Sequence, residues 1–167
     1  MRALRAAACA FGLLLSDSQA QEDPGKERVG QILVSVYYAT DGDPSLAGAK
    51  AAEVPEALAD RLQKDERLRF GHYRALGRDT QPLYRSYENW AQPLKPSDEV
   101  LVRFEARSKP TVESVRLDLE LWLSRKKIMK TDATVERGRP LFVLGPRWRG
   151  GQLIIAVALA PDEKQGS

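Results

Sequence analysis

His72 is the only histidine in the chain, and it is the first residue to consider for catalysis or metal binding. A hydrolytic triad would pair it with a serine nucleophile, but the sequence contains no Gly-x-Ser-x-Gly elbow. A zinc site would need further histidine or cysteine ligands, and the acidic residues are not spaced as metal ligands. We therefore expect His72 to be a surface or hydrogen-bonded residue, and we expect neither a metal nor a cofactor.

Acidic residues are numerous, with 23 Asp and Glu in total, and two carboxyl groups can carry glycoside hydrolysis. Nothing in the sequence singles out two of them. The turn Asp41-Gly42-Asp43-Pro44 resembles the start of a calcium loop, but Leu46 and Ala52 stand where an EF-hand needs glycine and glutamate. Glycine-rich phosphate loops are absent from the sequence. These features predict a protein that is not an enzyme, with a small carboxylate-dependent hydrolase of glycan or cell-wall material as the alternative.

Aromatic side chains are the best candidates for binding. The segment Tyr84–Trp90 is dense in side chains that have an apolar body and a polar tip. Trp122 stands on the otherwise charged face of an alternating segment, where it would either anchor a partner or pack against a neighbouring strand or a lysine stem. Trp, Tyr and Arg carry much of the binding energy of protein interfaces. The candidates for partner binding are Tyr87, Trp90, Trp122, Arg147 and Arg149.

The first twenty residues have the layout of a secretory signal peptide. Arg2 and Arg5 supply positive charge, an uncharged run follows over 6–15, and the small residues Ser18 and Ala20 precede the expected cut. We expect cleavage directly after Ala20. The alternative is an uncleaved transmembrane anchor, which would need about 20 apolar residues, roughly twice the length of this run. After cleavage we expect no stable membrane anchor.

Cleavage would also change the chemistry of the chain. Cys9 is the only cysteine, so the mature protein would have no thiol for catalysis, disulfide exchange or zinc binding. Loss of two arginines and one aspartate would lower the net charge from +3 to +2. The remaining charges are interspersed, whereas nucleic-acid-binding proteins cluster their Lys and Arg residues. We expect an exported protein, periplasmic or extracellular, that does not bind nucleic acid.

The rest of the chain has the length of a single domain, expected over 30–160. Polar, turn-rich residues predict a flexible lead-in over 21–29 and a similar tail over 161–167.

Within the domain we predict one helix and several strands. Residues 32–38 are β-branched and aromatic, which is typical of a strand. From Phe70 onward every segment is typical of strand or turn, and 77–82 is expected to be a turn between two strands. Residues 99–107 alternate well and residues 115–124 alternate strictly, which predicts one face on a core and one face largely in water. The helix is predicted from an apolar stripe with four-residue spacing: Val54, Leu58 and Leu62. The expected fold class is α+β, mostly β, with one helix packed on an antiparallel sheet of successive hairpins in the order β-α-β-β-β-β-β-β.

The C-terminal hairpin allows its register to be predicted. Gly150-Gly151 fits a two-residue turn that needs positive φ at both positions, which would place Arg149 opposite Gln152. Pro146 has no N–H to donate, so we expect an edge strand or a bulge around it. A longer loop over 145–151, leaving Trp148 exposed, is the alternative. The predicted register makes one face wholly apolar: Phe142, Leu144, Pro146, Trp148, Leu153, Ile155, Val157 and Leu159.

The turn segments also carry a resemblance. Gln81-Pro82-Leu83-Tyr84, Gly138-Arg139-Pro140-Leu141, and Gly145-Pro146 followed by Gly151-Gln152-Leu153-Ile154 make the chain similar to small exported proteins of unknown function from Verrucomicrobia- and Planctomycetes-type bacteria. The resemblance implies a cell-envelope location and no particular activity. Together with the export signal and the missing catalytic motifs, it predicts a non-catalytic envelope module that binds a protein or polymer partner.

Overall fold

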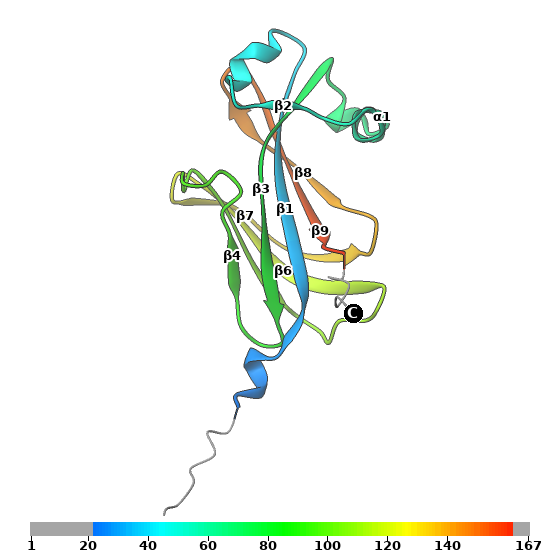
Figure 1. The fold of residues 1–167 in the computed structure, drawn as a ribbon, viewed down its shortest axis with the longest axis vertical. Coiled ribbons are helices and arrows are strands. Elements are labelled where there is room, and N and C mark those ends of the chain that lie inside the picture. The colour runs from blue at the N-terminus through cyan, green and yellow to red at the C-terminus, as the bar shows by residue number, and fades with distance from the viewer. Residues whose placement is uncertain (1–21, 162–167) are drawn as a thin grey trace, which may run out of the picture.

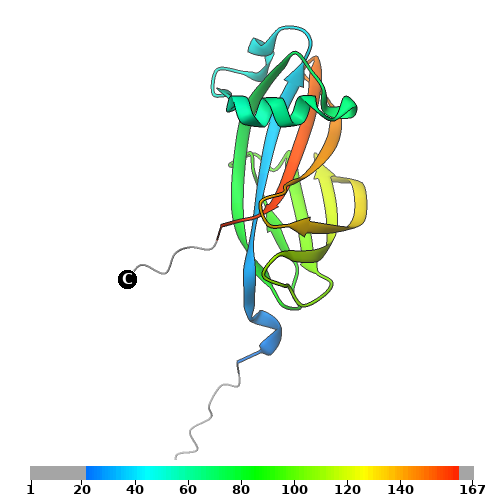
Figure 2. The same ribbon diagram turned by 90° about the vertical axis from the view of Figure 1, so that its right-hand side faces the viewer.

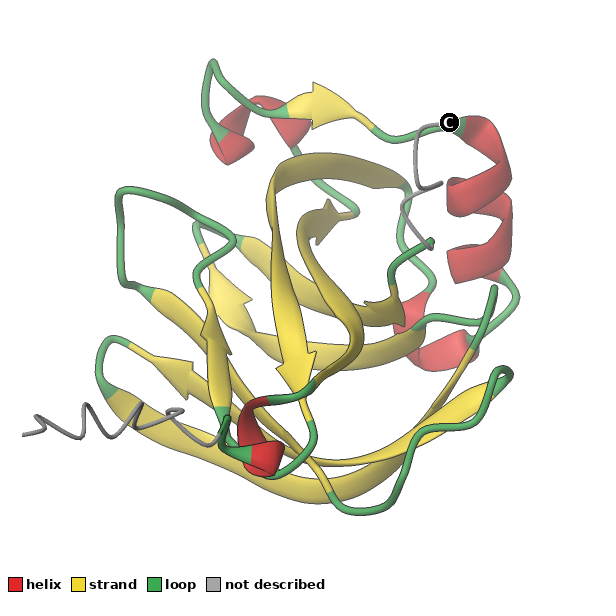
Figure 3. Cartoon of the chain, turned by 60° about the horizontal axis from the view of Figure 1, so that its bottom comes forward, coloured by secondary structure: helices red, strands yellow, loops and turns green. Residues whose placement is uncertain are grey.

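Two antiparallel sheets make up most of the computed structural model, which describes residues 22–161 (Figure 1). One sheet has the strand order β2-β3-β1-β9-β8 and the other the order β4-β5-β6-β7. Figure 3 shows the strands of both sheets around a common interior. The predicted α+β class, mostly β with one helix on antiparallel strands, is confirmed. The strands are β1 (Arg28–Thr40), β2 (Ala52–Glu53), β3 (His72–Tyr84), β4 (Asn89–Ala91), β5 (Val100–Ala106), β6 (Ser114–Leu123), β7 (Lys126–Glu136), β8 (Leu141–Trp148) and β9 (Gly151–Leu159).

The main core lies between the two sheets. The two alternating segments form β5 and β6, and each turns one face toward this core, since successive side chains of a strand point to opposite faces. The predicted inward faces of β5 and β6 are confirmed. The buried residues of this core are Ile32, Val34, Val36, Leu83, Ala91, Val100, Val102, Phe104, Val115, Leu117, Leu119, Leu121, Val135, Leu153, Ile155 and Val157.

A second, smaller core lies on the opposite side of the five-stranded sheet, under helix α1 (Glu56–Gln63). Figure 2 shows the helix crossing this face near one end of the long strands. Leu62 is fully buried there, and Val54 and Leu58 pack against the same cluster, so the predicted apolar stripe is confirmed. The sheet contributes Ala39, Tyr73 and Ile154 to it.

The segment 77–82 is not a turn but the middle of the long strand β3. It pairs with β1 along its length, for example Gly77 with Val36 and Pro82 with Gln31. Gly77 is glycine because the chain after β4 passes directly over it. A Cβ atom at this position would lie only 2.1 Å from the carbonyl oxygen of Pro93. The glycine at position 77 therefore reflects close packing of a neighbouring segment and not a turn.

The lead-in is part of the domain from Asp23 onward, which differs from the flexible segment predicted over 21–29. Residues Pro24–Lys26 form a 3₁₀ turn, and the carboxylate of Asp23 accepts the N–H of Gly25 at 2.8 Å. The Tyr87 hydroxyl donates to the same carboxylate, and β1 begins at Arg28. The predicted signal peptide and the tail beyond residue 161 lie outside the described residues.

The C-terminal hairpin has a different register from the predicted one. The turn residues are Arg149 and Gly150, with φ of 46° and 79°, and Trp148 pairs with Gly151. An irregularity between Leu144 and Arg147 shifts the register again, which is the expected bulge around Pro146. β8 is also an edge strand, as expected, because it is the last strand of its sheet. Beyond the bulge the predicted apolar face is wrong: Leu141 and Val143 pack against the main core, Phe142 packs under the helix, and Leu144 is exposed.

Candidate binding site on the four-stranded sheet

The outer face of the four-stranded sheet carries two of the predicted binding residues in contact with each other. Trp90 on β4 lies opposite Arg103 on β5. Trp122 on β6 lies opposite Leu101, which is two residues before Arg103 on the same strand. The Trp90 and Trp122 ring centres are 5.8 Å apart and the rings are inclined at 59°. Trp90 is 37% exposed. The structure therefore joins these two residues into one aromatic patch, which we call the tryptophan pair.

A network of ion pairs lies beside the tryptophan pair on the same face. Arg103 is central, because its guanidinium contacts Glu88, Glu105 and Asp118 on three sides. The indole N–H of Trp122 donates to Glu120 at 3.0 Å, and Lys127 lies 5.5 Å from the centre of the Trp122 ring. Equal numbers of cations and carboxylates take part: Arg103, Arg107, Arg116, Lys127 and Lys130 with Glu88, Glu105, Asp118, Glu120 and Asp132.

This network favours the charged forms of Glu88, Glu120 and Lys130. The hydrogen bond from Arg103 lowers the pKa of Glu88. Burial works to raise the pKa of Glu120, but hydrogen bonds from Trp122, Lys130 and Lys127 outweigh it, and the net shift is downward. Hydrogen bonds to Glu120 and Asp118 raise the pKa of Lys130. The face therefore keeps a fixed and balanced charge pattern near neutral pH.

The expectation that this face is largely in water is wrong for its central carboxylates. Asp118 is only 2% exposed and Glu120 only 6%, because long Arg and Lys side chains lie over them. The sequence contains part of a signal for this arrangement. Antiparallel pairing places Arg103 opposite Glu120, an oppositely charged pair, but it also places Glu105 opposite Asp118, two like charges. The Arg103 guanidinium, 3.0 Å from Glu105 and 3.5 Å from Asp118, offsets their repulsion.

The two buried carboxylates, Asp118 and Glu120, are paired with the same cation. Lys130 Nζ lies 3.3 Å from Asp118 Oδ2 and 3.3 Å from Glu120 Oε1, so the carboxyl groups are neighbours held by a shared cation. A general acid needs a raised pKa, whereas that of Glu120 is lowered. The surface hollows formed around Asp41, Asp65 and Glu136 each contain one carboxylate side chain. The arrangement gives the hydrolase alternative no support.

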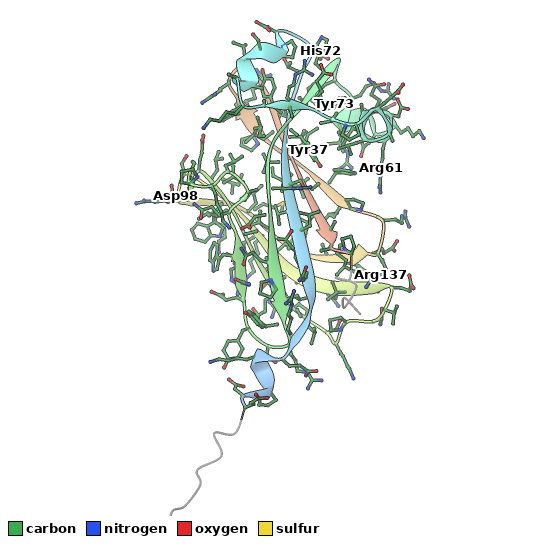
Figure 4. The ribbon with its side chains drawn as sticks, viewed as in Figure 1. Tyr37, Arg61, His72, Tyr73, Asp98 and Arg137 are labelled. Atoms are coloured by element: carbon green, nitrogen blue, oxygen red, sulfur yellow. The ribbon has the colours of Figure 1, made fainter. Side chains whose placement is uncertain are left out.

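The other predicted binding residues lie elsewhere. Tyr87 is 44% exposed, but its hydroxyl is engaged by Asp23 of the N-terminal turn. Arg149 is in the β8–β9 turn and Arg147 lies two residues before it, and both line a separate hollow. His72 is exposed at the start of β3, and Figure 4 shows it well apart from the labelled Asp98 and Arg137.

The described residues contain neither a metal-binding group nor a membrane-spanning helix. No group of three or more His, Cys, Asp or Glu side chains within residues 22–161 is arranged to hold a metal ion. In the same part of the chain, no helix is both long enough and apolar enough to cross a bilayer.

Comparison of the chain with protein-family models, with curated proteins and with solved structures finds no match.

Proposed function

We propose that the chain is a non-catalytic binding module of the cell envelope, and that the tryptophan pair is the centre of its contact with a partner protein. The observation that carries the proposal is the contact of Trp90 with Trp122 on a sheet face that also carries a network of ion pairs. Export is supported by the signal-peptide layout of residues 1–20.

The surroundings of the tryptophan pair suit a protein interface. Aromatic anchors contribute most when the contacts around them exclude water. Here Glu88 accepts the Trp90 indole N–H at 3.4 Å, and Glu120 accepts that of Trp122. Both rings are thus oriented before any partner arrives, which reduces the entropy lost on binding.

The balanced charge of the face also favours a protein over a charged polymer. Long-range attraction of an acidic or basic polymer requires an excess of one sign. This face offers intermixed positive and negative groups instead, a pattern that a complementary protein surface can match locally. We therefore expect binding to the partner to depend only moderately on salt.

The test uses the mature chain, from residue 21 onward, as bait on envelope extract. Wild-type protein should retain a partner that the Trp90→Ala variant loses, because Trp90 is exposed and its removal leaves the core intact. Leu144→Ala is the matched control, since Leu144 is 43% exposed on the other sheet. Trp90→Phe should restore part of the binding.

Two results would contradict the proposal. One is an identical set of bound proteins for wild type and Trp90→Ala. The other is co-sedimentation of the wild-type chain with purified cell-wall polymer, abolished by Trp90→Ala, which would assign the face to a polymer. The export component is tested separately by mass spectrometry of the native protein, whose N-terminus should be Gln21.

A further inference from the structure

A hollow of about 430 Å³ lies at the end of the molecule where β1 ends and the β8–β9 turn begins. Its size is within the range of small-molecule sites. Two guanidinium groups, one carboxylate and two aromatic rings line it, and none belongs to the tryptophan pair. The lining residues are Thr40, Asp41, Gly42, Phe70, Arg147, Trp148, Arg149, Gly150, Gly151 and Gln152.

The charge of the hollow is positive. Arg147 and Arg149 face a single carboxylate, that of Asp41, whose Oδ1 already accepts the N–H of Gly71 at 2.7 Å. Arginine presents a planar fork of N–H donors that matches the oxygens of carboxylate and phosphate groups. We propose that this hollow binds an anionic oxygen group, a phosphate or a carboxylate, carried by a small molecule or by the end of a polymer.

Arg149 is fixed in place by its neighbours. Its backbone has a left-handed φ of 46° in the tight turn, and the Tyr38 hydroxyl donates to its carbonyl oxygen at 3.1 Å. Its guanidinium carbon lies 4.3 Å from the centre of the Trp148 ring, so the fork is stacked on an aromatic face. A preorganised donor of this kind loses little entropy when an anion binds.

The Arg149 guanidinium lies beside Gly48, where an added Cβ atom would be 3.4 Å from Arg149 Nη1, an ordinary contact distance. Phe70 and Trp148 give the hollow apolar walls. The preferred ligand therefore combines one anionic group with an apolar or ring-shaped body.

The test is a titration of ¹⁵N-labelled mature protein with inorganic phosphate and, separately, with acetate, each against sodium chloride at equal ionic strength. The amide signals of Gly150, Gly151 and Gln152 should shift saturably with at least one of the two anions. Phosphate alone or acetate alone would identify the oxygen group. Shifts no larger than those in chloride would overturn the proposal.

Arginine variants distinguish binding of the anion in this hollow from nonspecific attraction of anions to positive charge. Arg147→Gln and Arg149→Gln should each weaken binding by about tenfold or more, since a charge-assisted bond to the anion is lost. Arg147 is exposed, so its variant is expected to fold even if Arg149→Gln does not. Arg78→Gln, an exposed arginine on β3 outside the hollow, is the matched control. Equal weakening by Arg78→Gln would refute the site.

This proposal does not depend on the tryptophan pair. Trp90→Ala should leave anion binding unchanged, so failure of one proposal can be told from failure of the other.

Discussion

The close approach of the chain to Gly77 predicts a large effect from adding a single methyl group. In Gly77→Ala, the new Cβ would lie 2.1 Å from the Pro93 carbonyl oxygen, whereas ordinary contact begins at 3.4 Å. The Pro93 backbone must therefore move by about 1 Å. Forcing atoms into a packed site costs about 1–3 kcal/mol, and the contact here is with backbone, which cannot swing aside as a side chain can.

The same displacement would disturb the anchor of the following loop. The carboxylate of Asp79 accepts the backbone N–H of Gln92 and the ammonium of Lys95, both at 2.8 Å. These bonds hold the segment that directly follows β4, the strand that carries Trp90. We therefore expect Gly77→Ala to lower the free energy of unfolding by about 3 kcal/mol and to loosen the contact between Trp90 and Trp122.

The assay is equilibrium urea unfolding at neutral pH, with Gly30→Ala as the matched control. Gly30 lies on β1, where the nearest atom to an added Cβ is 4.0 Å away, so alanine there should be neutral or stabilising by up to about 1 kcal/mol. The slope of the transition should stay the same in both variants. A difference between the variants below about 1 kcal/mol would refute the argument from close packing.

Three further predictions concern stability. Burial works to raise the pKa of Asp79, but hydrogen bonds from Gln92, Lys95 and Gln81 outweigh it, and the pKa is lowered. The stability that Asp79 contributes is therefore present above its ordinary pKa and lost as pH falls through its lowered value, so urea midpoints of Asp79→Asn should fall less between about pH 5 and pH 2 than those of wild type. Leu62→Ala should cost about 2–5 kcal/mol in urea unfolding because Leu62 is fully buried, whereas Leu46→Ala, at 49% exposure, should cost under about 1 kcal/mol; equal losses would contradict the burial of the helix. Tyr38→Phe should cost about 1 kcal/mol and lower the thermal midpoint, because it removes the bond to Arg149, and an unchanged midpoint would show that this bond adds nothing.

Local patterns in the sequence were sufficient where the structure depends on neighbours along the chain. The alternation on β5 and β6 correctly identified the inward face, and the stripe of Leu58 and Leu62 identified the helix. Each pattern follows from the geometry of one element, so it needs no knowledge of what packs against it.

Glycine and proline were ambiguous because the same residues serve turns and tight packing. Gly151 is glycine because a Cβ there would lie 2.4 Å from the Tyr38 ring, and Gly150 because its φ is positive. Assigning both to the turn moved the predicted register of the hairpin. The bulge around Pro146 then reversed the faces of the residues before it, since side chains alternate along a strand.

By itself, the sequence determined the class of fold, the inward faces of the main strands, the helix and the identity of the candidate binding residues. Tertiary structure alone decided that Trp90 meets Trp122, that Arg147 and Arg149 share a hollow, and that cations cover Asp118 and Glu120. Trp90 and Trp122 lie on two strands that each pair with β5, and the hollow forms where the end of β1 lies beside β9. Local periodicity does not encode such long-range pairings, because they are set by the packing energy of the whole core.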